Sequence, residues 1–159
     1  MKRSKAAFLS LVAALGLALS AGPGLTQSLE KDIVGTWGFV SSNAYGPNPQ
    51  GSFTFDTSGH FSAILMKSDL PKYASNNRTQ GTAAEYKATV EGSLAYFGTY
   101  SVSGTDLILH VVGSTFPNWN GTDQRRTNVS VKGDELTYVQ PTPSGGGATG
   151  APNVWKRMK

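Results

Sequence analysis

The 159-residue sequence has no cysteine, and this absence excludes several classes of protein. Without thiols there is no disulfide framework, no thiolate metal site, no catalytic thiol and no lipid-anchored N-terminal cysteine. The sequence also lacks a glycine-rich phosphate loop, a nucleophile elbow and a zinc signature. With only two histidines, a multi-histidine zinc site is not expected either. We therefore expect the protein to bind no metal ion and no cofactor.

Charged residues are also scarce, at 15% of the chain, and their distribution argues against nucleic acid. Lys2, Arg3 and Lys5 precede an apolar run over residues 6–19. Removing those three from the 14 Lys and Arg leaves 11 basic groups against 10 acidic ones. The rest of the chain has a net charge near zero, so it has little electrostatic attraction for a phosphate backbone or for anionic lipid. We expect no nucleic-acid partner.

The N-terminus has the three parts of a secretory signal: a basic start, an apolar core and small residues after it. The small side chains of Ala18 and Ser20 predict cleavage after Ser20. A membrane anchor is the alternative, but a span needs about 20 apolar residues, and this run ends before Pro23. We expect residues 1–20 to be a signal peptide, 21–32 a linker, and the mature protein to be periplasmic or secreted, without stable membrane insertion.

Most of the remaining chain alternates apolar and polar residues, which is the period of a β-strand. The segments that alternate are rich in β-branched or aromatic residues and are bounded by Gly, Pro, Asn or Asp. Eight segments fit this description: 34–41, 52–56, 60–67, 95–102, 106–112, 124–131, 135–140 and 153–157.

The segment from Thr82 to Glu91 lacks this alternation and predicts a short helix. Thr82 and Glu85 have the spacing of a capping box, in which the hydroxyl and the carboxylate satisfy amide groups of the first turn. Gly92 suits the position just after the last turn.

The connections between the expected strands alternate in length. Tight turns at 57–59, 103–105 and 132–134 alternate with connections of about ten residues or more. If the strands run up and down in chain order, all the long connections lie on one rim. Residues 33–159 are therefore predicted to form an all-β, eight-stranded antiparallel up-and-down barrel, with one short helix between strands three and four. A barrel of this size encloses side chains or one small ligand.

Short motifs along residues 33–157 resemble those of the lipocalin-like domain family, a group of calycin-type small β-barrels. The motifs are Gly35-Thr36-Trp37, Pro49-x-Gly51-x-Phe53-x-Phe55-Asp56, Gly59-His60-Phe61-Ser62, Pro71-Lys72-Tyr73-Ala74, Gly81-Thr82-Ala83-Ala84-Glu85, Tyr96-Phe97-Gly98-Thr99-Tyr100, Pro117-Asn118-Trp119-x-Gly121-Thr122-Asp123-Gln124-x-Arg126, Asp134-Glu135-Leu136-Thr137 and Trp155-x-Arg157. The resemblance implies a small β-barrel, while members of the family mostly have no known activity. The chain departs from the better-studied secreted lipocalins in lacking their disulfides.

Two polar residues on the expected strands are candidate anchors for a ligand. Arg126 shares a strand face with Asn128 and Ser130. If that face looks inward, the guanidinium would bind a ligand carboxylate or phenolate; if it looks outward, Arg126 is an ordinary solvated residue. The motif match around Arg126 favours the inward orientation. His110 would be either a general base or a hydrogen-bonded residue of the lumen or wall.

Two further candidates have structural alternatives. Trp37 and Arg157 lie on the first and last strands, which are neighbours in a barrel, so the basic side chain would lie across the indole and close the barrel. This structural role is preferred to Trp37 as a ligand platform. Glu85 would form a candidate site if it were buried beside Arg126, and otherwise it caps the helix.

The preferred function is a non-enzymatic exported binding protein that holds one small apolar or amphipathic molecule in the barrel mouth. Aromatic rings at a mouth suit contact with such a guest. The expected apolar contacts are Tyr86, Phe116 and Trp119, and the expected polar anchors are His110 and Arg126. The alternative for Trp119 is a lid that covers the barrel with no guest.

Two other functions are kept as alternatives. One is a barrel isomerase or cyclase that acts on a small organic substrate. There, Glu85 or His110 would move a proton. Arg126 or Tyr100 would stabilise developing negative charge. The other is an envelope interaction protein without a small-molecule ligand, which predicts an exposed aromatic patch around Trp119.

Overall fold

The computed structural model describes residues 29–146 and 149–159. The expected signal peptide, residues 1–20, lies outside the described residues, and so does most of the expected linker. Within the described ranges, no helix is both long and apolar enough to cross a membrane.

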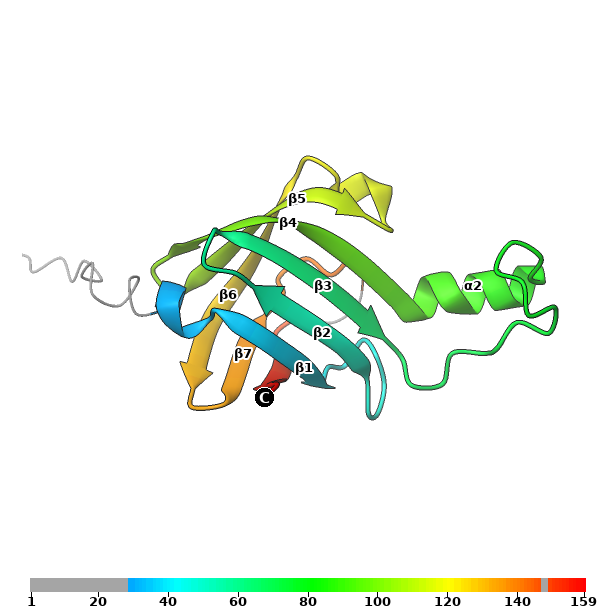
Figure 1. The fold of residues 1–159 in the computed structure, drawn as a ribbon, viewed down its shortest axis with the longest axis horizontal. Helices are drawn as coiled ribbons and strands as arrows, with labels where there is room; N and C mark the ends of the chain where they lie inside the picture. The colour runs from blue at the N-terminus through cyan, green and yellow to red at the C-terminus, as the bar shows by residue number, and fades with distance from the viewer. Residues whose placement is uncertain (1–28, 147–148) are drawn as a thin grey trace, which may run out of the picture.

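Eight antiparallel strands pair in chain order, and the last strand pairs with the first to close a barrel (Figure 1). The elements are β1 (Gly35–Ser41), β2 (Gln50–Phe55), β3 (His60–Met66), α2 (Ala83–Gly92), β4 (Ser93–Ser103), β5 (Asp106–Ser114), η1 (Pro117–Trp119), β6 (Asp123–Lys132), β7 (Glu135–Val139) and β8 (Pro152–Arg157). The predicted all-β, eight-stranded up-and-down barrel with one helix between β3 and β4 is confirmed. β4 begins two residues before the predicted start because Ser93 and Leu94 still pair with β3.

The strand β3 shows how alternation in the sequence becomes an inner and an outer barrel face. Phe61, Ala63 and Leu65 are buried, while the residues between them are exposed. Successive side chains of a strand point to opposite faces, so this register places one apolar set in the core. On the next strand, β4, position 98 has no room for a side chain. A Cβ atom at Gly98 would lie 1.9 Å from the carbonyl oxygen of His110.

The two ends of the barrel differ in the length of their connections. The tight connections β2–β3, β4–β5 and β6–β7 gather at one end, here called the turn end, on the left of Figure 1. The connections 42–49, 67–82 with α2, 115–122 and 140–151 gather at the other, the loop end. This is the arrangement that the alternating loop lengths predict for an up-and-down barrel.

The turn end is closed by side chains from the first and last strands. Trp37 is fully buried, and its indole Nε1 donates to the carbonyl oxygen of Ile33 at 2.8 Å. The Arg157 guanidinium lies 4.0 Å from the centre of the Trp37 ring. It also donates to the carbonyl oxygens of Val34 and Asp32, at 2.8 and 2.7 Å. These contacts tie the segment that precedes β1 to the end of β8.

Between the two ends, aromatic rings fill the barrel. Phe53 is fully buried, and its ring centre lies 4.2 Å from that of Phe55 and 5.4 Å from that of Trp155. Phe39 stacks on Trp155 at 4.3 Å. Burial of such side chains is the main source of stability for the barrel, at roughly 1.5–3 kcal/mol for each large apolar side chain.

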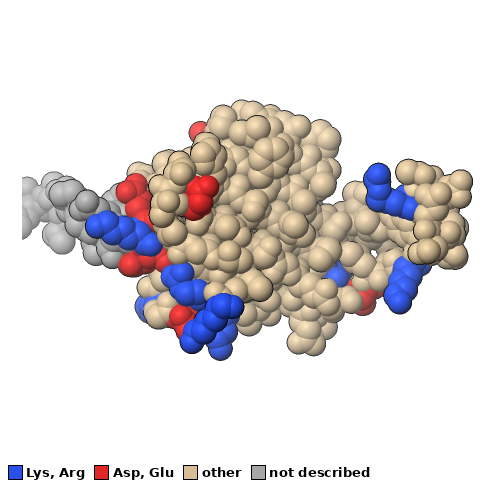
Figure 2. All heavy atoms as spheres, viewed as in Figure 1, with Lys and Arg blue, Asp and Glu red and all other residues tan. Residues whose placement is uncertain are grey.

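The helix α2 projects from the loop end instead of covering the barrel (Figure 1). Its capping box is present, with Thr82 accepting from the Glu85 amide and the Glu85 carboxylate accepting from the Thr82 amide. Figure 2 shows mostly Lys and Arg side chains on this arm and mixed charges near the turn end, with few charges between them on the face in view.

Candidate functional site

The loop end contains all three buried polar or charged side chains of the described residues. They are Gln124 and Arg126 on β6 and Asn153 on β8. Each lies within the first four residues of its strand, and both strands begin at the loop end. The polar part of the lumen is therefore at the end that carries the long loops.

Arg126 is fully buried, which places its guanidinium inside the barrel. Its two terminal nitrogens donate to the carbonyl oxygen of Arg125 at 3.0 Å and to the hydroxyl of Tyr96 at 3.2 Å. Its Nε has no hydrogen-bond partner among the described residues. Because an unsatisfied buried donor is costly, this nitrogen marks a position where an acceptor would bind favourably.

No carboxylate neutralises Arg126. All ten acidic residues of the chain lie in the described ranges, and none of the ion pairs there includes Arg126. Burial opposes its charge, but interactions with Tyr96 and Tyr138 outweigh this, and the pKa of Arg126 is raised above its ordinary value. Since arginine stays protonated in proteins, the lumen holds a permanent positive charge.

Aromatic rings surround this charge. The Arg126 Cζ lies 5.7 Å from the ring centre of Trp119 and 5.7 Å from that of Tyr138. At such distances the electron-rich ring faces attract the guanidinium. Burial raises the pKa of the Tyr138 hydroxyl well above its ordinary value, as it does for Tyr45 on the β1–β2 loop. Both hydroxyls are therefore neutral at physiological pH.

A second buried donor without a partner lies beside Tyr138. The indole Nε1 of Trp155 forms no hydrogen bond with the described residues. Arg126 and Trp155 each lower the pKa of the Tyr138 hydroxyl against the effect of burial, which places both near that oxygen. Neither contact has the geometry of a hydrogen bond. The two donors without partners at the loop end thus lie beside the same tyrosine hydroxyl.

Trp119 covers Arg126 from the loop end. It lies on η1, only 6% of it is exposed, and its ring meets that of Tyr96 edge-on at 5.2 Å. Phe116 packs against it at 6.0 Å. The short η1 holds this position through the Thr122 hydroxyl, which donates to the Trp119 carbonyl oxygen at 2.8 Å. Trp119 is therefore buried, and the exposed aromatic patch expected of an envelope interaction protein is not formed around it.

His110 lies on the outer face of β5 and does not reach Arg126. Its side chain is 54% exposed, and its Nδ1 is 2.9 Å from a carboxylate oxygen of Asp123. Leu107 and Leu109, which point into the barrel, take the opposite face of the strand. The structure does not bring the two expected polar anchors together.

The residues expected on the helix also lie away from the lumen. The Tyr86 hydroxyl accepts from the Gly81 amide at 2.8 Å, and its ring meets Tyr73 edge-on. The Glu85 carboxylate accepts from the Ala74 amide at 2.8 Å and from the Thr82 amide at 2.6 Å. These bonds lower the pKa of Glu85. The hypothesis of a buried pair between Glu85 and Arg126 is wrong, because α2 points away from the barrel.

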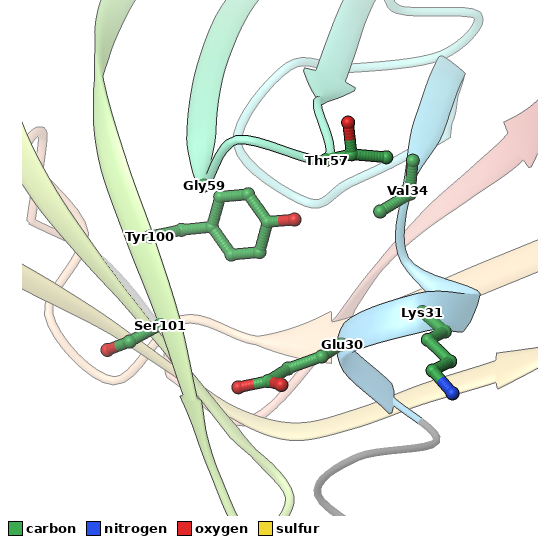
Figure 3. A pocket seen from close by; sticks show the side chains of 7 residues that line it. All are labelled: Glu30, Lys31, Val34, Thr57, Gly59, Tyr100 and Ser101. Atoms are coloured by element: carbon green, nitrogen blue, oxygen red, sulfur yellow. The ribbon is translucent and has the colours of Figure 1, made fainter.

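Tyr100 lies at the turn end, opposite Arg126. Its hydroxyl donates to the Asp56 carbonyl oxygen at 2.9 Å, and burial is the main cause that raises its pKa. It lines a pocket of about 510 Å³ with Glu30, Lys31, Val34, Thr57, Gly59 and Ser101 (Figure 3). In Figure 3 its ring points into the space between Thr57 and Val34. Among the described residues, no two of Glu85, Tyr100, His110 and Arg126 form a hydrogen bond with each other.

Sequence reasoning missed the partners of Arg126 and assigned the wrong faces to the part of β6 that follows it. Tyr96, Tyr138 and Trp155 carry the alternation of their strands, so the signal that they face inward was present. The prediction that Asn128 shares the face of Arg126 is wrong, because Asn128 is exposed. A bulge between Thr127 and Ser130, with Asn128 at φ 53°, switches the faces of β6 there.

A closed barrel with polar groups buried at its loop end defines the class of small β-barrels that enclose a site in their interior. The chain belongs to the lipocalin-like domain family, whose family model matches residues 34–158. It is also similar to a curated fungal protein, the 4'-hydroxy-3'-methoxypropiophenone carrier protein ppsC of Aspergillus oryzae. The two are 31% identical over 107 residues, which is 61% of this chain and 96% of the relative.

Proposed function

We propose that this protein is an exported carrier that holds one small apolar or amphipathic molecule at the loop end of its barrel. The observation that carries the proposal is the fully buried Arg126, which has a donor without a partner and lies beneath Trp119. A buried charge with an open donor is costly in a core that serves stability alone. The family and the similarity to a protein named as a carrier support a ligand-binding role.

The proposed contacts combine apolar and polar groups. Trp119 and Phe116 would contact the apolar part of the guest, and Arg126 would orient its polar part. Tyr86 and His110 are not part of this proposal because they lie on α2 and on the outer wall. The name of the relative refers to a phenolic aryl ketone. We extend that class to this chain and propose a small aromatic molecule as its guest.

Native mass spectrometry of the protein purified from its own host tests the carrier role. The expected result is a bound small molecule that is lost on denaturation. A protein that is empty, and that also fails to bind added 4'-hydroxy-3'-methoxypropiophenone by calorimetry, would contradict the proposal.

A pair of variants locates the guest. Phe116→Ala removes a ring from the loop end and is expected to weaken binding of the added ketone. Val34→Phe places a larger side chain in the turn-end pocket and is expected to leave binding unchanged. The reverse result would move the site to the turn end.

Export is a separate part of the proposal. It is supported by the basic start, apolar core and small residues of the N-terminus. N-terminal sequencing of the protein from its host is expected to begin at Ala21, after cleavage at Ser20. A mature chain that still begins with the apolar run would contradict export by this route.

A further inference from the structure

We infer that the guest is an aromatic molecule with an anionic oxygen, a phenolate or a carboxylate, which binds the Arg126 guanidinium. This inference rests on the proposed function, because it specifies the chemistry of the ligand at the same site. It is carried by the charge, the donors and the rings that the barrel places around Arg126.

The first argument concerns charge. The guanidinium of Arg126 is fully buried, and among the described residues no carboxylate forms an ion pair with it or is a cause of its raised pKa. A buried charge is tolerated at low cost only when a counter-charge or a full set of hydrogen bonds compensates it. A neutral guest would leave this charge without a counter-ion. An anionic guest supplies the counter-charge that the chain itself lacks.

The second argument concerns hydrogen-bond donors. Nε of Arg126 and Nε1 of Trp155 are both buried without partners, and both lie near the Tyr138 hydroxyl. A phenolate or carboxylate oxygen accepts several hydrogen bonds, and those from a guanidinium are among the strongest. An anionic oxygen would satisfy the open donor of Arg126 and lie within the same group of side chains as Trp155.

The third argument concerns the rings. Trp119 and Tyr138 each lie 5.7 Å from the Arg126 Cζ, and Tyr96 meets Trp119 edge-on. Flat aromatic walls favour a flat aromatic guest. Because Arg126 is fully buried, the guest reaches it only when a covering side chain moves. Trp119 is the side chain that covers it from the loop end, so binding is expected to change the surroundings of its indole.

The groups that face Arg126 determine how binding depends on pH. They are hydroxyls: Tyr96 on β4, Tyr138 on β7 and Tyr45 on the β1–β2 loop. Burial raises the pKa of Tyr138 and Tyr45 further above the ordinary tyrosine value. His110 lies on the outer face, where it meets Asp123. Near neutral pH, the group that titrates in the site is therefore the guest itself.

The experiment uses three probes on the full mature protein. The probes are 4-nitrophenol, which ionises near neutral pH with a change in absorbance, its neutral methyl ether 4-nitroanisole, and benzoate. Positive charge at Arg126 stabilises the phenolate, so the pKa of bound 4-nitrophenol is expected to fall. The expected preference for phenolate over neutral phenol is about 10-fold or more. The relative affinities of nitrophenolate and benzoate show which anionic group the site prefers.

Two variants separate Arg126 from its neighbour. Arg126→Met is expected to weaken nitrophenolate or benzoate by about 10- to 100-fold, the value of hydrogen bonds to a charged group. It is expected to leave 4-nitroanisole nearly unchanged. Arg125→Met is the matched control, because Arg125 lies on the outer face and pairs with Asp106. The shift in the pKa of the bound probe needs no variant and stands even if Arg126→Met folds poorly.

The outcomes separate this inference from the proposed function. Equal affinity of wild-type protein for 4-nitroanisole and nitrophenolate, with no shift in the pKa of the phenol, would overturn the anionic guest and leave the carrier role intact. Failure of all three probes, together with an empty protein from the host, would overturn both.

Discussion

The two ends of the barrel each place an arginine against a tryptophan, and the two arginines are satisfied very differently. At the turn end, Arg157 lies 4.0 Å from the Trp37 ring and donates to two backbone carbonyl oxygens. At the loop end, Arg126 lies 5.7 Å from the Trp119 ring, is fully buried and keeps an open donor. The guanidinium donors of the first arrangement reach backbone acceptors, whereas the second leaves Nε without a partner among the described residues.

This difference supports a structural role for the arginine at the turn end and the proposed binding role for the arginine at the loop end. Arg157 is partly exposed, with Asp134 4.0 Å away, so its charge is screened by water and by a carboxylate. Arg126 has neither. What distinguishes the structural arginine from the candidate binding arginine is therefore whether its donors have hydrogen-bond partners. Burial and contact with an aromatic ring do not distinguish them.

The largest expected change in stability comes from a substitution at the turn end. Arg157→Met removes the cation–ring contact and two hydrogen bonds from a charged donor. The free energy of unfolding is expected to fall by about 3 kcal/mol. Chemical denaturation measures this loss. The matched control is Lys156→Met on the same strand, where an exposed side chain is removed and a change within about 0.5 kcal/mol is expected. Equal effects of the two variants would show that Arg157 does not close the barrel.

The second largest expected change is an increase in stability. Arg126→Met replaces a buried charge with an apolar side chain of similar length. The free energy of unfolding of the ligand-free protein is expected to rise by about 1–2 kcal/mol. Chemical denaturation compares it with Arg125→Met, which removes the ion pair between the exposed Arg125 side chain and the mostly buried Asp106 and is expected to lower the free energy of unfolding by about 1 kcal/mol. A clear loss of stability in Arg126→Met would make Arg126 a structural residue like Arg157.

A smaller effect is expected on the arm that projects from the loop end. Thr82→Ala removes the side-chain cap of α2 and is expected to cost about 1 kcal/mol. Because α2 does not cover the lumen, the affinity for 4-nitrophenolate is expected to stay unchanged. Denaturation and calorimetry on the same sample measure both quantities. A loss of affinity would connect the arm to the site.

The smallest effect concerns pH. Hydrogen bonds from the Ala74 and Thr82 amides hold the pKa of Glu85 below its ordinary value. Its contribution to stability is therefore present above the pKa of the unfolded chain and is lost as the pH falls through the lower folded value. The protection of the Thr82 and Ala74 amides against hydrogen exchange, relative to the intrinsic rate at each pH, is expected to fall in this acidic window. In Glu85→Gln the protection is expected to lack this step; a step of the same size would assign it to another group.

The fold could be predicted from the sequence because its signals are local. Alternation identified the strands, the alternating loop lengths gave the barrel topology, and the Thr82–Glu85 spacing gave the helix start. The capping box works through groups within one turn of each other. These features do not depend on how distant segments meet.

The candidate site could be predicted only in part because it depends on distant contacts. The direction of α2, which separates Tyr86 from the lumen, is not encoded within the helix itself. The bulge at Asn128 adds one residue to β6 and reverses its faces beyond Arg126. The missing partner of the Arg126 Nε is a property of the whole lumen, since it requires every nearby acceptor to be placed first.

The three tryptophans provide the most direct test of the central claim that the loop end binds the guest. Trp119 covers Arg126, Trp155 lies deeper with an open Nε1, and Trp37 lies at the turn end with its Nε1 bound to Ile33. The measurement is a titration with 4-nitrophenolate followed through the three indole N–H resonances in nitrogen-15 NMR spectra. The signals of Trp119 and Trp155 are expected to shift together while that of Trp37 stays in place. A shift confined to Trp37, or no shift in any of the three, would contradict the account.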